Sequence, residues 1–152
     1  MRTFLFLGSA QRFSDFALLL LRVFVGLFLI WSAWDSITST EQMHGFAAFL
    51  AEHKFPNPEI LAPLSAYLRF AMGVGFILGL FTRWAGIFCV VHFAIAIAFV
   101  DRFDGMRGIF PSGSLVVMGL YLATHGAGRF SIDATQRAND LPRSNGGVRF
   151  KI

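Results

Sequence analysis

The sequence predicts an all-α integral membrane protein: a four-helix bundle with a short amphipathic helix in the outer loop between spans one and two. Of the 152 residues, 55% are hydrophobic and 19 are phenylalanine, and the mean hydropathy is +0.61. A soluble domain of this size cannot bury so much apolar surface in its core. The composition is explained by four apolar stretches with almost no charge, at residues 16–34, 60–81, 84–100 and 109–124.

Each apolar stretch is long enough to cross a bilayer as a helix. At a rise of about 1.5 Å per residue, roughly 17–22 residues match a hydrocarbon core of about 30 Å. Within that core every backbone polar group must bond inside its own segment, so we expect α-helices. The apolar run at residues 4–7 is too short for the core of a cleavable signal peptide, so the first span is expected to serve as an uncleaved anchor.

Basic residues predict the orientation of the spans. Four spans place both termini on one side, and short segments rich in Lys and Arg stay in the cytoplasm. The side with the termini carries many more basic residues than the other side, so we expect a multi-pass protein of the bacterial inner membrane with both termini cytoplasmic. The terminal side has Arg2, Arg12, Arg83, Arg129, Arg137, Arg143, Arg149 and Lys151, and the other side has Lys54, Arg102 and Arg107.

The loop between spans one and two contains the predicted amphipathic helix. Apolar residues recur at helical spacing from Met43 to Leu50, with acidic residues and histidines on the rest of the surface. Such a helix lies on the outer surface of the membrane. Pro56 and Pro58 end it, because proline cannot continue a helix and disfavours helical geometry in the preceding residue.

The remaining connections are short, and the chain forms one membrane domain. Only Thr82 and Arg83 separate spans two and three, which predicts a tight antiparallel hairpin between them. The segment 101–108 is expected to be a short loop. Apolar periodicity is lost after the glycines at 126 and 128, so we assign residues 1–134 to a four-span membrane domain and 135–152 to a flexible cytoplasmic tail.

Small residues predict where helices approach each other. Ala71, Gly75 and Gly79 are four residues apart in span two and form a smooth stripe against which another helix can pack. Gly73 lies on a different face, which it shares with Arg69, and is expected to belong to the same ligand or partner site. The single cysteine, Cys89, cannot form a disulfide within the chain.

Two arginines inside the spans are the strongest candidates for function. A guanidinium in hydrocarbon costs at least about 2.5–3.5 kcal/mol, so it needs an acid, carbonyls, water or an anionic ligand. Arg22 lies near the cytoplasmic edge of span one, and its side chain leans toward that edge. We expect it to reach lipid headgroups, with a ligand or partner contact as the alternative.

Arg69 lies deeper, in the middle of span two, and reaches the headgroups with more difficulty. All nine acidic residues lie outside or at the ends of the spans, so none can pair with it at matching depth. His92 in span three lies at similar depth, and Ser112 or Ser114 adds a hydroxyl from span four. A quinone, another ligand or a partner subunit is therefore expected at Arg69; carbonyls and water are the alternative.

The sequence argues against a metal, a covalent cofactor and nucleic acid. His44 and His53 are nine residues apart, which is not a metal-binding spacing, and His92 and His125 lie at different depths, which does not suit a haem. No phosphate-binding loop or nucleophile elbow is found, so we expect no catalytic residues and no complete enzyme in this chain. The net charge of +4 follows membrane topology and does not form a nucleic-acid patch.

Four stretches resemble the DoxX family of small four-helix membrane proteins, and the similarity covers residues 19–134. They are LLRVFVGLFL at 20–29, FPNP at 55–58 followed by Leu61 and Ala62, GLFTR at 79–83, and GAGRFSIDA at 126–134. Each stretch alone is weak, but their order and spacing around four spans are specific. The resemblance implies a bundle that accompanies redox complexes, either as a small subunit of quinone-linked assemblies or as a membrane anchor for soluble redox partners.

The chain departs from the family pattern at two places. Many relatives are expected to carry Glu in span two, where this chain has Arg69, and a Glu there would pair with Arg22. Two cations repel instead, which favours an acidic or acceptor ligand, or a carboxylate from another subunit. The basic residue that usually closes span one is also missing, and Asp35 and Ser36 stand there.

We therefore expect a membrane accessory subunit of a quinone-linked redox complex, with Arg69 and His92 at the quinone and no metal of its own. A purely structural anchor that binds acidic lipid or a partner's carboxylate is the alternative. A small-anion transporter is a third hypothesis, which the absence of internal repeats disfavours. The expected partners are the lipid membrane and other membrane subunits, and the sequence leaves a homo-oligomer open.

Overall fold

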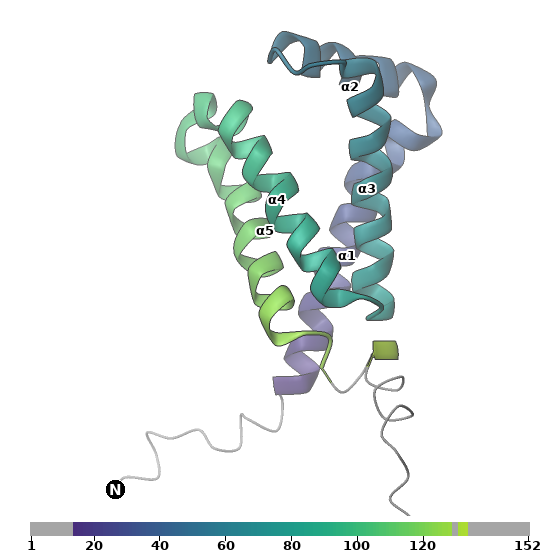
Figure 1. Ribbon diagram of the computed structural model, residues 1–152, viewed down its shortest axis with the longest axis vertical. Coiled ribbons are helices and arrows are strands. Elements are labelled where there is room, and N and C mark those ends of the chain that lie inside the picture. The colour runs from purple at the N-terminus through teal and green to yellow at the C-terminus, as the bar shows by residue number, and fades with distance from the viewer. Residues whose placement is uncertain (1–13, 129–130, 134–152) are drawn as a thin grey trace, which may run out of the picture.

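The computed structural model describes residues 14–128 and 131–133, and the described residues are helical almost throughout. The predicted tail at 135–152 lies outside them. Four helices are long and apolar enough to cross a membrane, which confirms the all-α membrane fold. The elements are α1 Ser14–Thr38, α2 Thr40–Glu52, α3 Pro58–Leu78, α4 Thr82–Phe99, a 3₁₀ helix η2 at Asp101–Asp104, and α5 Gly105–His125 (Figure 1).

The bundle consists of two helix pairs. The most extensive contacts join α1 to α3 and α4 to α5, whereas α3 and α4 contact each other much less. Figure 1 shows the two pairs meeting where α1 begins and α5 ends, which we call the terminal end, and diverging toward α2. A tight turn joins α3 to α4, as predicted, but it consists of residues 79–81, because Thr82 and Arg83 already belong to α4. The two helices touch, although each packs mainly on a different partner.

Glycines allow the close approach within each pair. A Cβ on Gly73 of α3 would lie 2.7 Å from the carbonyl oxygen of Gly26 in α1, and the reverse contact is equally close. In the other pair, a Cβ on Gly86 of α4 would lie 2.7 Å from the carbonyl oxygen of Gly119 in α5. Backbones this close gain van der Waals contact that larger side chains would prevent.

The predicted stripe of Ala71, Gly75 and Gly79 does not lie at either of these two glycine contacts. Ala71 is exposed. Gly75 faces the turn, where a Cβ would lie 3.3 Å from the carbonyl oxygen of Leu80. Gly79 ends α3 in the left-handed conformation, with φ of 66°, which a glycine adopts without steric cost.

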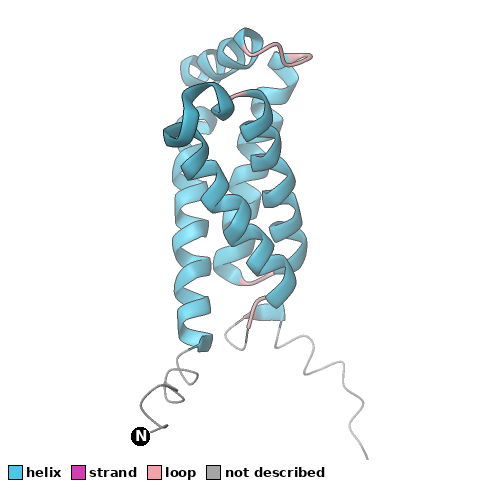
Figure 2. Cartoon of the chain, turned by 90° about the vertical axis from the view of Figure 1, so that its left-hand side faces the viewer, coloured by secondary structure: helices cyan, strands magenta, loops and turns pink. Residues whose placement is uncertain are grey.

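The amphipathic helix is present as α2, at the opposite end of the bundle from the terminal end, and we call this the α2 end. Its N-cap is Ser39, whose hydroxyl accepts a hydrogen bond from the backbone N–H of Gln42 at 3.4 Å. The helix lies across the ends of α1 and α3 and contacts both (Figures 1 and 2). The expected loop at 101–108 is wrong, because η2 and the first turn of α5 occupy it.

The core is narrow, and most large apolar side chains face outward. Buried residues include Leu29, Phe76 and Leu122, while Trp31 and Phe24 are among many exposed aromatic side chains. In water such a surface would aggregate. In a bilayer it is the surface that contacts lipid, which agrees with the four spans.

Candidate functional site

Arg22 holds the terminal end of the bundle together. Only 1% of its surface is exposed. Its Nε donates to the carbonyl of Phe76 at 3.0 Å, one Nη donates to the carbonyl of Ile77 at 3.3 Å, and the other Nη donates to the carbonyl of Ala127. The last carbonyls of a helix have no partner within the helix, so a guanidinium with five N–H donors suits them.

The expectation that Arg22 reaches lipid headgroups is therefore wrong. The side chain leans toward the terminal end, as predicted, but it meets the end of α3 and the segment after α5 before it reaches the surface. Asp133, further along the chain after α5, binds the turn between α3 and α4. Its carboxylate accepts from the backbone N–H groups of Phe81 and Thr82 at 2.9 and 3.1 Å, at the start of α4.

Arg69 has a different environment, near the middle of α3 on the side facing α2. One Nη donates a long hydrogen bond of 3.4 Å to the carbonyl of Ser32, and the guanidinium carbon lies 5.0 Å from the centre of the Phe46 ring. Its Nε is buried and has no hydrogen-bond partner among the described residues. Arg69 is thus only partly satisfied, unlike Arg22.

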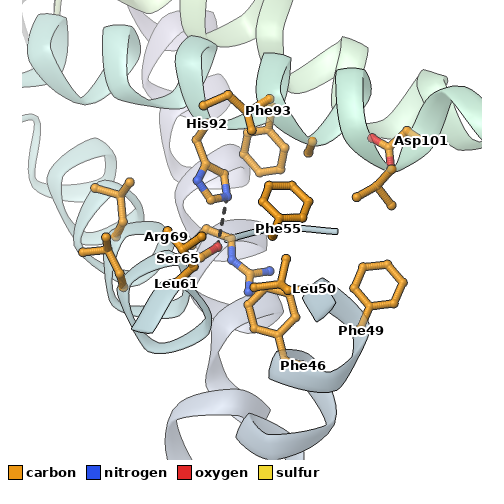
Figure 3. A pocket seen from close by; sticks show the side chains of 15 residues that line it. Phe46, Phe49, Leu50, Phe55, Leu61, Ser65, Arg69, His92, Phe93 and Asp101 are labelled. Atoms are coloured by element: carbon orange, nitrogen blue, oxygen red, sulfur yellow. Dashed lines mark hydrogen bonds between the residues drawn. The ribbon is translucent and has the colours of Figure 1, made fainter. Parts of the chain in front are cut away.

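Beside Arg69 lies a cavity of about 300 Å³ between α3 and α4, below α2, which we call the Arg69 cavity (Figure 3). Aromatic and aliphatic side chains make up most of the wall, and the few polar ones are Ser65, Arg69, His92 and Asp101. The apolar wall residues are Phe46, Phe49, Leu50, Phe55, Leu61, Leu64, Leu68, Phe93, Ile95, Ala96 and Val100.

The structure brings His92 to this cavity together with Arg69. The His92 Nε2 lies 3.4 Å from the Ser65 hydroxyl (Figure 3). Ser65 precedes Arg69 by one helical turn in α3. The His92 ring packs edge-on against Phe93. Two hydrogen-bonding groups, a guanidinium and an imidazole, therefore meet in a mostly apolar space. Such an arrangement can orient an uncharged or weakly anionic ring that carries oxygen acceptors.

The other predicted site residues lie away from the Arg69 cavity. The Ser114 hydroxyl donates to the carbonyl of Phe110 in its own helix at 2.7 Å. Gly73 lies at the crossing of α1 and α3, and Arg22 lies at the terminal end. Among the described residues, no three His, Cys, Asp or Glu side chains lie together where they could hold a metal ion.

Comparison with known protein families decides the classification. The family model described as DoxX matches residues 17–102, which is more than half of the chain. The chain belongs to the DoxX family. Searches of curated proteins and of solved structures gave no match.

The fold explains how the DoxX-like stretches lie in space. Arg22 from the first stretch, the turn at 79–83 and the segment beginning at Gly126 meet at the terminal end. The family match ends at Arg102, so this last segment lies beyond it, yet it is bonded to both of the others. Phe55, from the remaining stretch, lines the Arg69 cavity and packs 5.0 Å from Phe99 between ring centres.

Sequence reasoning missed Ser65, Asp101 and the aromatic residues from α2. Ser65 was detectable, because a residue four positions before Arg69 shares its helix face. Phe46 and Phe49 were assigned to the membrane surface, since an amphipathic helix alone does not show what its apolar face covers. Asp101 was assigned to a loop outside the third span, and nothing in its neighbourhood indicated a cavity.

Proposed function

We propose that this DoxX protein is a small accessory subunit of a quinone-linked redox complex and that the Arg69 cavity holds the quinone head. The observation that carries the proposal is the buried Arg69 Nε, which has no hydrogen-bond partner among the described residues and lies beside a cavity. Leaving such a donor unsatisfied costs about 1–3 kcal/mol, which a ligand acceptor recovers.

The chemistry of the wall suits a quinone. A quinone head is a flat ring with carbonyl acceptors, and the Arg69 and His92 nitrogens can donate to them. The rings of Phe46, Phe55 and Phe93 offer faces and edges for packing against it. A positive group also stabilises the charge that develops on the oxygen when the head is reduced.

The route into the cavity suits a ligand dissolved in lipid. Leu64 of α3 and Ile95 of α4 belong to the wall, yet they are 59% and 44% exposed on the surface that faces the bilayer. An isoprenoid tail can leave the cavity between them into the membrane.

We place the electron carriers on partner subunits. From the charge tally, we place both termini in the cytoplasm of a bacterial inner membrane.

A photoreactive quinone tests this proposal in nanodiscs. We expect an azidoquinone to label peptides from α2, α3 and α4 that line the Arg69 cavity, and an excess of unmodified quinone to suppress that labelling. Val117 and Leu120 are exposed on α5, which contributes no residue to the cavity wall, so peptides from α5 report background labelling. Labelling of the cavity peptides at the α5 level, without competition, would leave the chain as a purely structural anchor.

A further inference from the structure

Asp101 contributes a second unsatisfied group to the Arg69 cavity. Its Oδ2 atom is buried and has no hydrogen-bond partner within the described part of the chain, and its side chain lines the cavity. It belongs to η2, directly after α4. A buried carboxylate oxygen without a donor is rare in proteins and calls for an explanation such as an absent ligand.

The two unsatisfied groups have opposite hydrogen-bonding character. The Arg69 Nε can only donate, whereas the Asp101 Oδ2 accepts. They come from different helix pairs, since Arg69 belongs to α3 and Asp101 follows α4. Figure 3 shows the two side chains entering from different sides, with aromatic side chains between and around them. A ligand that satisfies both must therefore carry an acceptor on one side and a hydroxyl or other donor on the other.

The redox state of a quinone changes this pattern. The oxidised head has two carbonyl oxygens, which only accept, so one of them would meet the Asp101 oxygen without a hydrogen between them. The reduced head has two hydroxyl groups, each of which can donate to one partner and accept from another. Only the reduced head can accept from Arg69 and donate to Asp101 at the same time.

Resting on the proposed quinone role, we propose that Asp101 is a specificity-determining residue that makes the Arg69 cavity bind the hydroquinone form in preference to the quinone. Discrimination of this kind is strong, because the wrong ligand leaves a buried polar group unpaired. The apolar wall further excludes ligands that carry a full charge at each end, because their desolvation is costly.

The test measures the affinity of the protein in nanodiscs for the oxidised and the reduced form of one short-chain quinone, with empty nanodiscs as the blank. We expect the wild type to bind the hydroquinone roughly tenfold more tightly than the quinone, in line with one hydrogen bond to a charged group. Asp101→Asn keeps the shape of the side chain and offers both an N–H donor and a carbonyl acceptor, which suit either redox form, so the preference should be lost. Asp101→Ala leaves neither a donor nor an acceptor at this position, so the two redox forms should bind about equally.

Arg102→Gln is the matched control, because Arg102 is exposed on the same short helix and is not part of the cavity wall. It should keep the wild-type preference. If the wild type binds both forms equally and Asp101→Asn changes neither, the role of Asp101 is overturned while quinone binding stands. If neither form binds the wild type, the quinone role fails as well. Thermal unfolding of each variant shows whether it has kept its fold.

Discussion

Arg22→Leu is expected to lower the free energy of unfolding by about 3 kcal/mol, because three carbonyl groups at the terminal end lose the guanidinium as a donor. Phe76 keeps the N–H of Gly79 as a donor, but a buried carbonyl that loses a charged donor is costly, and leucine cannot replace the contact between α1, the end of α3 and the segment after α5. The loss should appear as a lower unfolding midpoint when the purified protein is titrated with a denaturing detergent.

An exposed arginine at the same end provides the control. Arg83 lies in the first turn of α4 and its side chain is exposed, so Arg83→Leu should change stability by no more than about 0.5 kcal/mol. Equal stability of Arg22→Leu and Arg83→Leu would show that the carbonyl contacts of Arg22 do not hold the bundle together.

Arg69→Leu is expected to reduce quinone affinity about tenfold to a hundredfold and to leave the stability unchanged or slightly higher. Hydrogen bonds to a charged group contribute about 1.5–3 kcal/mol, which corresponds to that range of affinity. The variant also removes a buried nitrogen that has no partner among the described residues, so folding loses little. Equilibrium binding of a short-chain quinone, together with detergent unfolding, measures both quantities.

Arg107→Leu is the matched control for binding, because Arg107 is an exposed cation near the start of α5 and is not part of the cavity wall. Its affinity should equal that of the wild type. The opposite result, in which Arg69→Leu unfolds easily and binds quinone normally, would assign Arg69 to the structure and remove it from the ligand site.

Much of the fold could be predicted from the sequence. The four spans and α2 are encoded in local patterns of apolar residues, which act within single segments. The pairing of the helices could not be predicted from the stripe at Ala71, Gly75 and Gly79. Close packing requires a small residue on both partners at the same level, and it is Gly73 that meets one, Gly26 of α1.

The two arginines show why the candidate site was only half predictable. The cost of burying a guanidinium follows from its charge and depth, so both positions were identified. Their partners were not, since Arg22 bonds to backbone carbonyls, which every residue has and which no sequence pattern marks. For Arg69 the depth argument led to His92, whereas Asp101 enters the cavity only because the chain turns into η2 directly after α4.

Whether the Arg69 cavity binds a quinone head can be seen in an experimental structure of the protein in nanodiscs with a saturating short-chain quinone. We expect ring-shaped density beside Phe46 and Phe93, with a ligand oxygen within hydrogen-bonding distance of the Arg69 Nε. A cavity without such density, or an Arg69 side chain turned onto carbonyls of its own chain, would contradict it.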